Sequence, residues 1–456
     1  MESSHGTPDP PPLITRPLQD GSEGTQNVPV TALNLPLARV FANPRFRELA
    51  AAVLLAGATV RLGLSLVEAF ANMSDFRIVF IPNAVLAWQG VNPYRDIPLG
   101  AQGTFSGPLA GSVYTPTFLM LMWPWTWLPD AAGRITWILG ELASLAGILV
   151  LVARGLGGMT RAQLMLGMAL MMVFPPVRDS FNEGQVSLLL GFLVVAALFA
   201  AERGNPRLAG LCLGLAVAIK ITPVLLVPYF LWRRRWGAAI YAGVVLALTI
   251  AATFALGWGA YWGPFVRAVG EVGQGTANLL NQSLNGVILR AYDPRLNGYP
   301  IAPPPPLPRA LVAVASLLLL TALLAHLRRR RLPTREQPWA DIALLLLALP
   351  LIQPFAWPHH FAQAAVFCPV AVALVARRRL PASAAVVLAA AYLALLLFSF
   401  PLYRQAVSLP PAELAGNPGP LLGGSLLFFA VVAGAATWGL LRLTDPGEPA
   451  AATRQS

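Results

Sequence analysis

The chain has 456 residues, of which 56% are hydrophobic and only 11% are charged. Soluble domains carry about 25% charged residues, so this composition nearly excludes a water-soluble enzyme. The formal net charge is +12 at pH 7, but basic residues in a membrane protein usually mark its cytoplasmic loops, so we expect no nucleic-acid partner.

Runs of about 20 apolar residues recur along most of the chain, and this is the length of a helix that spans a bilayer. They predict an all-α polytopic membrane protein: a disordered cytoplasmic tail over residues 1–46, a transmembrane domain over residues 47–442 and a second cytoplasmic tail over residues 443–456. We expect about ten full transmembrane helices. The predicted spans are residues 47–71, 133–154, 160–176, 186–201, 236–257, 307–327, 338–355, 361–376, 381–402 and 420–442.

Two further apolar stretches lack the pattern of a full crossing. Residues 113–129 are interrupted by three prolines, and we expect this segment to dip into the membrane without crossing it. Residues 207–232 are interrupted by Lys220 and Pro223. We expect this second stretch to form a hairpin that returns to the side on which it began.

The arginines orient these segments. With the N-terminus inside the cell, the arginine clusters all lie on the cytoplasmic side, as the positive-inside rule requires. The outer loops then carry most of the polar, non-basic sequence, namely residues 72–112, 178–185, 258–306 and 357–360. We therefore expect a protein of the cell membrane whose site lies on the extracytoplasmic face.

Two charged residues stand out against this apolar background. Asp75 opens the first outer loop, residues 72–112, where a carboxylate can act as a general base for a hydroxyl; a cap for a helix over residues 76–88 is the alternative. Lys220 is the only lysine in the sequence, and an intramembrane ammonium is costly unless it is paired. A compact point charge suits a phosphate, and snorkelling to the interface is the alternative.

His359 and His360 follow Trp357-Pro358 in a tight outer turn between two predicted helices. Adjacent histidines on a turn can bind an anion, shuttle a proton or hold a metal. The nearby loops offer few further metal ligands, so we expect no metal site. An ordinary hydrogen-bonded histidine is the alternative for at least one of the pair.

Carboxamides gather in two of the outer loops, in Asn182-Glu183-Gly184-Gln185 and in Asn281-Gln282-Ser283. Each amide both donates and accepts hydrogen bonds, which suits the hydroxyl groups of a sugar. Helix caps and turns are the alternative explanation for both clusters. Four aromatic residues suit stacking on a sugar or an interfacial aromatic belt: Trp88, Tyr94, Tyr114 and Trp123.

Taken in order, these motifs resemble one family. They are Asp75-Phe76-Arg77, Gly90-Val91-Asn92-Pro93-Tyr94, Tyr114-Thr115-Pro116, Asn182-Glu183-Gly184-Gln185-Val186, Ala218-Ile219-Lys220-Ile221-Thr222-Pro223, Arg233-Arg234-Arg235-Trp236, Asn281-Gln282-Ser283-Leu284 and Trp357-Pro358-His359-His360. The set is similar to glycosyltransferase family 87, the polyprenyl-phosphate-mannose-dependent mannosyltransferases of the C-type glycosyltransferase superfamily. The resemblance covers the chain from about residue 70 to residue 365.

The resemblance implies an integral-membrane hexosyltransferase without a cofactor. It would move a sugar, mannose by the resemblance, from a polyprenyl-phosphate donor to a lipid or envelope-glycan acceptor. The family's base maps onto Asp75 and its basic hairpin residue onto Lys220, and we expect His359 and His360 to join Lys220 at the donor phosphate. The remaining predicted contacts to sugar are Arg77, Tyr94, Asn182, Gln185, Asn281, Gln282 and Ser283.

The chain departs from the family at one position, because Pro358 stands where the family often has an acidic residue before the paired histidines. A secondary transporter or lipid flippase is the main alternative, since broken helices and an intramembrane lysine are equally typical of transporters. A purely structural scaffold would leave Lys220 unexplained. Polar loops on one side only, and the absence of an internal sequence repeat, favour the enzyme.

Overall fold

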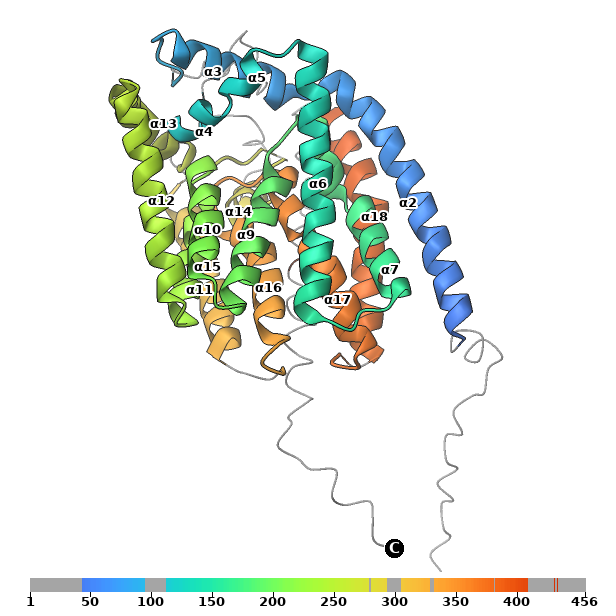
Figure 1. Ribbon diagram of the computed structural model, residues 1–456. Helices are drawn as coiled ribbons and strands as arrows, with labels where there is room; N and C mark the ends of the chain where they lie inside the picture. The colour runs from blue at the N-terminus through green and yellow to red at the C-terminus, as the bar shows by residue number, and fades with distance from the viewer. Residues whose placement is uncertain are drawn as a thin grey trace, which may run out of the picture. The chain divides into compact units, whose positions relative to one another are not determined.

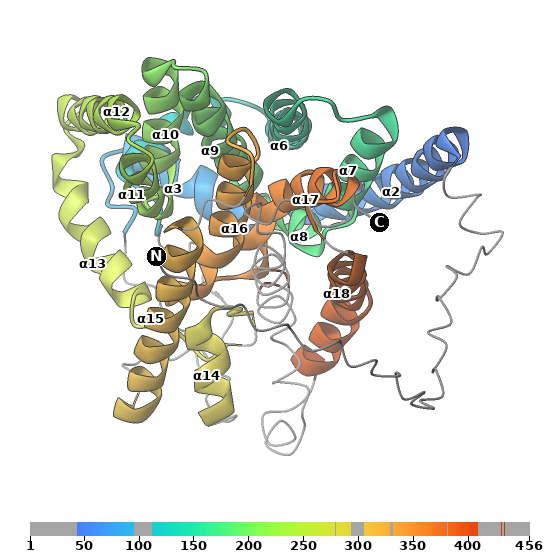
Figure 2. The same ribbon diagram turned by 90° about the horizontal axis from the view of Figure 1, so that it is seen from below.

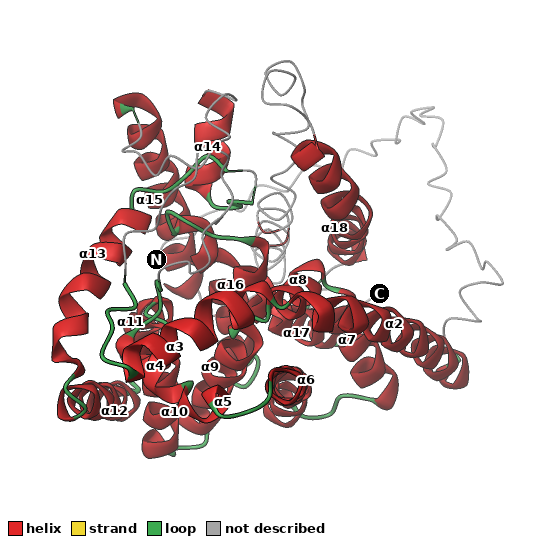
Figure 3. Ribbon diagram, turned by 90° about the horizontal axis from the view of Figure 1, so that it is seen from above, coloured by secondary structure: helices red, strands yellow, loops and turns green. Residues whose placement is uncertain are grey.

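Helices account for every regular element of the residues that the structure describes, in agreement with the predicted all-α fold class (Figure 3). The structure is a computed structural model. The chain divides into two units, residues 1–47 and residues 48–456, and the helical bundle belongs to the second. The described residues are 43–94, 112–278, 280–292, 305–328, 332–380, 382–408, 430 and 433.

Some of the predicted segments lie outside these ranges. They include nearly all of the predicted N-terminal tail, the whole of the tail predicted over residues 443–456, and residues 95–111 of the first outer loop. The last predicted span, residues 420–442, also lies outside, apart from two helical residues at 430 and 433.

Among the described residues, five helices are long and apolar enough to cross a membrane. A bent pair, α7 (Arg161–Val173) and α8 (Pro175–Glu183), makes a sixth span if it is counted as one. The five are α2 (Pro44–Asn72, continued by η1, Asp75–Phe80, and α3, Ile81–Trp88), α6 (Asp130–Leu156), α12 (Trp236–Ala255), α15 (Pro306–Arg328) and the pair η5 (Pro358–Val366) and α17 (Phe367–Ala376).

The expected count of about ten full crossings is not confirmed, because several predicted spans are short helices. Helices α9 (Ser187–Glu202) and α16 (Gln337–Ile352) have 16 residues each, which at a rise of 1.5 Å per residue gives about 24 Å, less than the hydrocarbon core. Almost every residue of α16 is buried, so neighbouring helices rather than lipid surround it. The predicted span over residues 381–402 corresponds to α18 (Ala382–Ser408).

The segment expected to dip into the membrane is two short helices, α4 (Pro116–Leu121) and α5 (Trp123–Thr126), which lie beside α3 at the upper end of the bundle in Figure 1. Thr115 begins this segment as an N-cap, since its hydroxyl accepts a hydrogen bond from the backbone of Phe118 at 3.0 Å. The upper end also carries η3 (Trp258–Tyr261) and α13 (Trp262–Val272), and α14 (Leu284–Tyr292) follows them along the chain.

The expected hairpin is α10 (Pro206–Ile219), a break at Lys220, and the pair η2 (Thr222–Leu226) and α11 (Val227–Trp232). Glu202 lies just before α10 and Arg235 just after α11, and the two form an ion pair at 3.0 Å. Because the two ends of the segment meet, the chain leaves it on the side on which it entered. This agrees with a hairpin.

Helix α10 packs between α9 and α12, as Figure 2 shows from below. Two glycines allow the close approach to α12. A Cβ atom at Gly210 would lie 2.2 Å from Cβ of Tyr241, and one at Gly214 would lie 2.7 Å from Cβ of Val245. The hairpin is therefore fixed against α12 by backbone proximity, which also fixes the depth of its tip.

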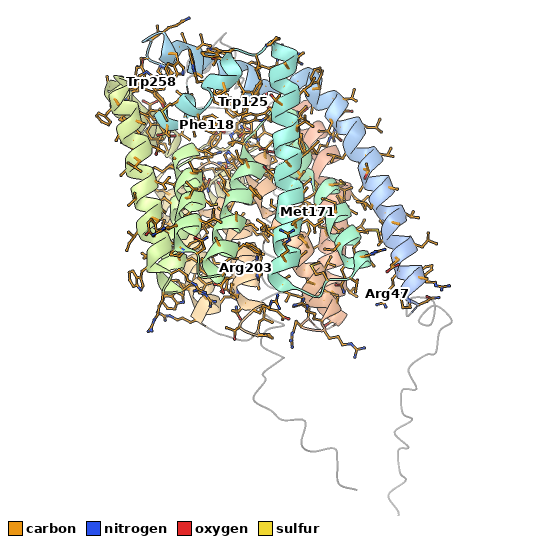
Figure 4. The ribbon with its side chains drawn as sticks, in the orientation of Figure 1. Arg47, Phe118, Trp125, Met171, Arg203 and Trp258 are labelled. Carbon is orange, nitrogen blue, oxygen red and sulfur yellow. The ribbon has the colours of Figure 1, made fainter. Side chains whose placement is uncertain are left out.

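The two ends of the bundle differ in chemistry. The lower end in Figure 4 carries Arg203. At the end of α17 the guanidinium of Arg377 donates to Glu336 at 2.8 Å and also to the backbone carbonyl of Gly157. The opposite end carries tryptophans, of which Trp125 and Trp258 are labelled in Figure 4. The positive-inside rule would place the end that carries Arg203 in the cytoplasm, and this orientation stays a prediction.

We expect Gly210→Ala to destabilise the protein by about 1–3 kcal/mol, because the new methyl group would overlap α12. Gly243, on α12 itself, is the matched control, since nothing lies within 4 Å of a Cβ atom built there. Gly243→Ala should raise stability slightly through helix propensity. Thermal unfolding of both variants in detergent measures the difference, and a Gly210→Ala variant as stable as the wild type would contradict the packing described above.

Candidate active site

Asp75 lies where the long helix α2 ends. The backbone of Met73 has a φ of 42°, in the left-handed region, and this residue separates α2 from the turn of π-helix that begins at Asp75. The N-cap position of that turn is Ser74, which makes no side-chain capping bond. The Asp75 side chain instead accepts a hydrogen bond from Nε2 of Gln185. In this structure Asp75 is therefore not used as a helix cap.

Gln185 is held from several directions. Its Oε1 accepts a hydrogen bond from the hydroxyl of Tyr114 at 2.7 Å, and its backbone carbonyl accepts one from Nε1 of Trp137 at 3.3 Å. Glu141, one turn along α6 from Trp137, accepts from the backbone of Leu188 and Leu189 at the start of α9. Helix α6 thus holds the segment that presents Gln185 to Asp75.

Lys220 ends α10 with an extended backbone, φ −141° and ψ 133°. Its Nζ lies 5.2 Å from the centroid of the Tyr114 ring, and it interacts electrostatically with Asp75. The adjacent turn of α10 is fixed by Thr115, whose hydroxyl donates to the carbonyl of Ala218. Within the described ranges the half-buried Lys220 has no ion-pair partner, so its charge is available to an anion.

The two histidines lie at the start of η5, with ring centroids 4.7 Å apart and planes at 81°. Nδ1 of the buried His359 lies 3.3 Å from Oδ2 of Asp179 on α8. Asp179 thus brings a carboxylate next to His359, although the residue before the histidine pair is Pro358. A carboxylate beside Nδ1 holds the imidazole ring in one orientation and leaves Nε2 for another group.

These groups form one electrostatic cluster. Asp75 interacts with His359, Lys220 and Asp179, and His360 interacts with both Lys220 and His359. The predicted base and the three predicted phosphate ligands therefore lie near one another, although they come from three separate parts of the chain. Within the described part of the chain, no three His, Cys, Asp or Glu side chains are grouped so as to hold a metal ion.

Asn281 joins the second carboxamide cluster to the turn before the histidines. Its Nδ2 donates to the carbonyls of Thr276 and Pro354 at 2.8 and 3.0 Å, and its Oδ1 accepts from the backbone of Ser283 and Ala356. The backbone N–H of Gln282 donates to the carbonyl of Ala356 at 2.7 Å. These bonds are to protein groups, so the geometry gives Asn281 a structural role, and its contact with sugar stays a prediction.

Arg290 on α14 organises the same loop. It is 1% exposed, and its Nη1 donates to the carbonyls of Asn278 and Asn281 at 2.6 and 2.9 Å. Burial lowers the pKa of Arg290 to about 10, which still leaves it charged at neutral pH. A buried cation therefore fixes the loop that carries Gln282 and Ser283, both of which are themselves buried.

The other predicted sugar contacts lie in different settings. The hydroxyl of Tyr94 donates to the carbonyl of Tyr114 at 2.8 Å, and burial raises the pKa of Tyr94, so it remains a neutral donor. Asn182 donates to Glu183 at 3.1 Å. Arg77 is exposed, and its Nε lies 3.8 Å from Oδ1 of Asp130. The contacts of these three residues with sugar stay predictions.

Sequence reasoning missed the roles of three side chains. From the sequence, Tyr114 was considered for stacking, for an aromatic belt and as part of a family motif. Glu183 was considered only as part of a carboxamide motif, and Asp179 was not singled out. Glu183 accepts a hydrogen bond from the hydroxyl of Ser74, next to Asp75. The available signal was the density of polar residues over 178–185, a stretch that lies between two apolar helices.

The fold and this cluster define a class of protein: a polytopic membrane protein whose polar cluster is built at the broken ends of its helices. The family model of glycosyltransferase family 87 matches residues 113–354, more than half of the chain. The chain belongs to glycosyltransferase family 87. It is therefore a glycosyltransferase rather than the transporter or scaffold that the sequence left open.

Several characterised proteins are similar to this chain. The polyprenol-phosphate-mannose-dependent α-(1-2)-phosphatidylinositol pentamannoside mannosyltransferase of Mycobacterium tuberculosis (strain CDC 1551 / Oshkosh) is 28% identical over 76% of this chain and 78% of that protein. The corresponding phosphatidylinositol mannoside mannosyltransferase of Mycolicibacterium smegmatis is 29% identical over 60% of this chain and 62% of its own length. Among solved structures, ArnT from Cupriavidus metallidurans bound to undecaprenyl phosphate covers 87% of this chain and 78% of its own, with 14% identity and a TM-score of 0.41.

Proposed function

We propose that this enzyme transfers a hexose, with mannose the first candidate, from a polyprenyl-phosphate donor to the hydroxyl of a lipid or envelope-glycan acceptor. The observation that carries the proposal is the pairing of a half-buried carboxylate, Asp75, with a half-buried cation, Lys220, which has no ion-pair partner among the residues that the structure describes. The names of the similar mannosyltransferases support the donor and make a phosphatidylinositol-linked mannoside the first acceptor to test.

The reaction needs a base on one side of the sugar and a cation on the other. Asp75 takes the proton of the acceptor hydroxyl as its oxygen forms a bond to the anomeric carbon. The bond from that carbon to the phosphate oxygen breaks, and the departing polyprenyl phosphate keeps the electron pair. This direct displacement through an oxocarbenium-like transition state inverts the anomeric centre.

Negative charge grows on the leaving phosphate, and the proposal assigns it to Lys220 with His359 and His360. A cation already in place at a water-poor site stabilises such charge more than one in bulk water, because no solvent has to reorganise. The carboxylate of Asp179, beside Nδ1 of His359, leaves Nε2 of that ring to face the phosphate. For sugar contacts we propose Asn182, Gln282 and Arg77, together with the loop that Asn281 and Ser283 shape and the segment that Tyr94 and Gln185 hold.

The proposal places the enzyme in the cell membrane with this site on the extracytoplasmic face. The support is the distribution of charge, since the arginine-rich end of the bundle is opposite to the site. A polyprenyl donor requires that the site open to the bilayer, where each buried CH₂ group contributes roughly 0.8 kcal/mol to binding.

We expect purified protein in detergent to consume polyprenyl-phosphate mannose and release free polyprenyl phosphate. Asp75→Asn keeps the size of the side chain but removes the basic oxygen, so turnover should fall by roughly 10²–10⁴. Mass spectrometry of the lipid products measures the release of polyprenyl phosphate by the wild type and the turnover of the variant. If the wild type leaves every polyprenyl-phosphate sugar intact, the proposed function is wrong; if Asp75→Asn keeps more than about a tenth of the activity, Asp75 is not the base.

Lys220→Met removes the charge at nearly constant volume, and the fold should survive because loss of an intramembrane charge is neutral or favourable for insertion. Affinity for polyprenyl phosphate should fall by about 2–4 kcal/mol, which is roughly 30- to 1000-fold. Lys220→Arg should recover part of the lost affinity, since the guanidinium restores the positive charge but is planar, whereas the ammonium is a compact point charge. Thermal-shift measurements with polyprenyl phosphate alone compare the affinities of the three proteins. Equal affinity of the wild type and the Met variant would remove Lys220 from the phosphate site.

Single cysteines test the orientation of the bundle. Gly270 on α13 is exposed with open space around it, whereas Arg161 is exposed at the start of α7, and the natural Cys212 and Cys368 are buried. In whole cells a membrane-impermeant thiol reagent should label Gly270→Cys and not Arg161→Cys. The reverse pattern would place the candidate site on the cytoplasmic face.

A further inference from the structure

Tyr114 lies between the two charged groups of the candidate site and is linked to both. Its hydroxyl donates to Oε1 of Gln185, whose Nε2 donates to Oδ2 of Asp75. Its ring lies 5.2 Å from Nζ of Lys220. We infer that Tyr114 is a positioning residue for sugar transfer, which fixes the Asp75 carboxylate through Gln185 and holds the Lys220 ammonium against its ring. The inference rests on the proposed function.

The direction of the hydrogen bonds follows from the groups involved. An ionised carboxylate only accepts hydrogen bonds, so the amide NH₂ of Gln185 has to face Asp75 and its Oε1 has to face away. Gln185 is 2% exposed, so water cannot serve that oxygen, and a buried acceptor without a donor carries its full desolvation cost. The Tyr114 hydroxyl therefore has to donate, and it holds Gln185 in the orientation that Asp75 needs.

The consequence for Asp75 is that its two oxygens differ. Oδ2 receives the hydrogen bond of Gln185, whereas Oδ1 has no hydrogen-bond donor among the residues that the structure describes. A carboxylate fixed through one oxygen presents the other in a defined direction. Oδ1 is therefore the oxygen placed to receive the proton of the acceptor hydroxyl.

The link to Lys220 is of a different kind. An aromatic ring attracts an ammonium group through its negative face but does not neutralise its charge, as a carboxylate partner would. The ring can thus hold Nζ in place and leave the full charge for an anion. Tyr114 is itself held in place. It is 5% exposed, and its carbonyl accepts a hydrogen bond from the hydroxyl of Tyr94. The centroid of its ring lies 4.8 Å from those of both Phe80 and Phe118.

Tyr114→Phe separates the two links, because it removes the hydroxyl and keeps the ring. We expect kcat to fall about 10-fold while the KM for polyprenyl-phosphate mannose changes by less than about twofold. Gln185→Leu should lower kcat at least as much. If the hydroxyl acts only through Gln185, the double variant should be no slower than Gln185→Leu alone.

The pH dependence of kcat/KM distinguishes positioning from a general loss of stability. In Tyr114→Phe and Gln185→Leu the acid limb should move to higher pH, because the Asp75 carboxylate loses or weakens a donated hydrogen bond. Lys220, His359, Asp179 and Glu183 also act on this carboxylate, but all four are unchanged in both variants. The shift between wild type and variant therefore reports the hydrogen bond.

Tyr261→Phe is the matched control. It removes a hydroxyl from another buried tyrosine, one that donates to the carbonyl of Ala87 at 3.2 Å, and kcat and the pH profile should stay as in the wild type. Thermal unfolding is measured on all the variants. The link to Asp75 is overturned if the losses in kcat of the two single variants multiply in the double variant. It is also overturned if the acid limb of the pH profile of Tyr114→Phe does not shift.

The link to Lys220 is tested without turnover, by the binding of undecaprenyl phosphate. Tyr114→Phe should bind it as the wild type does, and Tyr114→Leu, which has no ring, should bind it at least about fivefold more weakly. Equal affinity of the three proteins would overturn this link. A wild type that consumes no polyprenyl-phosphate sugar refutes the proposed function, whereas an active wild type with normal Tyr114 variants refutes the inference alone.

Discussion

A bilayer offers no water to the backbone, so every N–H and C=O group at membrane depth needs a partner within the protein. Whole helices meet this condition by themselves, but the candidate site lies where helices are broken: at Met73, between α8 and α9, at Lys220, and in the turn before η5. Each break exposes polar backbone groups. The structure of the site is largely the set of side chains that satisfies them.

Those side chains come from distant elements. Thr115 bonds the carbonyl of Ala218 at the end of α10, and Trp137 bonds that of Gln185 between α8 and α9. Asn281 bonds the carbonyl of Pro354 in the turn before η5. Each bond therefore does two things at once: it makes a broken helix tolerable at that depth, and it fixes the position of the functional residue next to the break.

The charged groups of the site are also held by neighbouring side chains. Asp75, Asp179 and Glu183 bring three carboxylates together, and Lys220 with the two histidines faces them. Gln185 and Ser74 donate hydrogen bonds to Asp75 and Glu183, and Nδ1 of His359 lies 3.3 Å from Asp179. Lys220 has an aromatic ring as its neighbour.

The sequence by itself determined the membrane class, the all-α fold, the hairpin broken at Lys220 and the family, because hydropathy, charge asymmetry and short ordered motifs are local properties of the chain. It also singled out Asp75, Lys220 and the paired histidines, since a charged residue in an apolar context is conspicuous. The tertiary structure alone decided that Asp179 faces His359 and that Tyr114 and Gln185 join Asp75 to Lys220. It also decided that the side chain of Asn281 bonds to backbone groups of the protein. Those contacts join residues 71 to 180 positions apart, and no spacing rule relates such positions; only the packing of the broken helices brings them together.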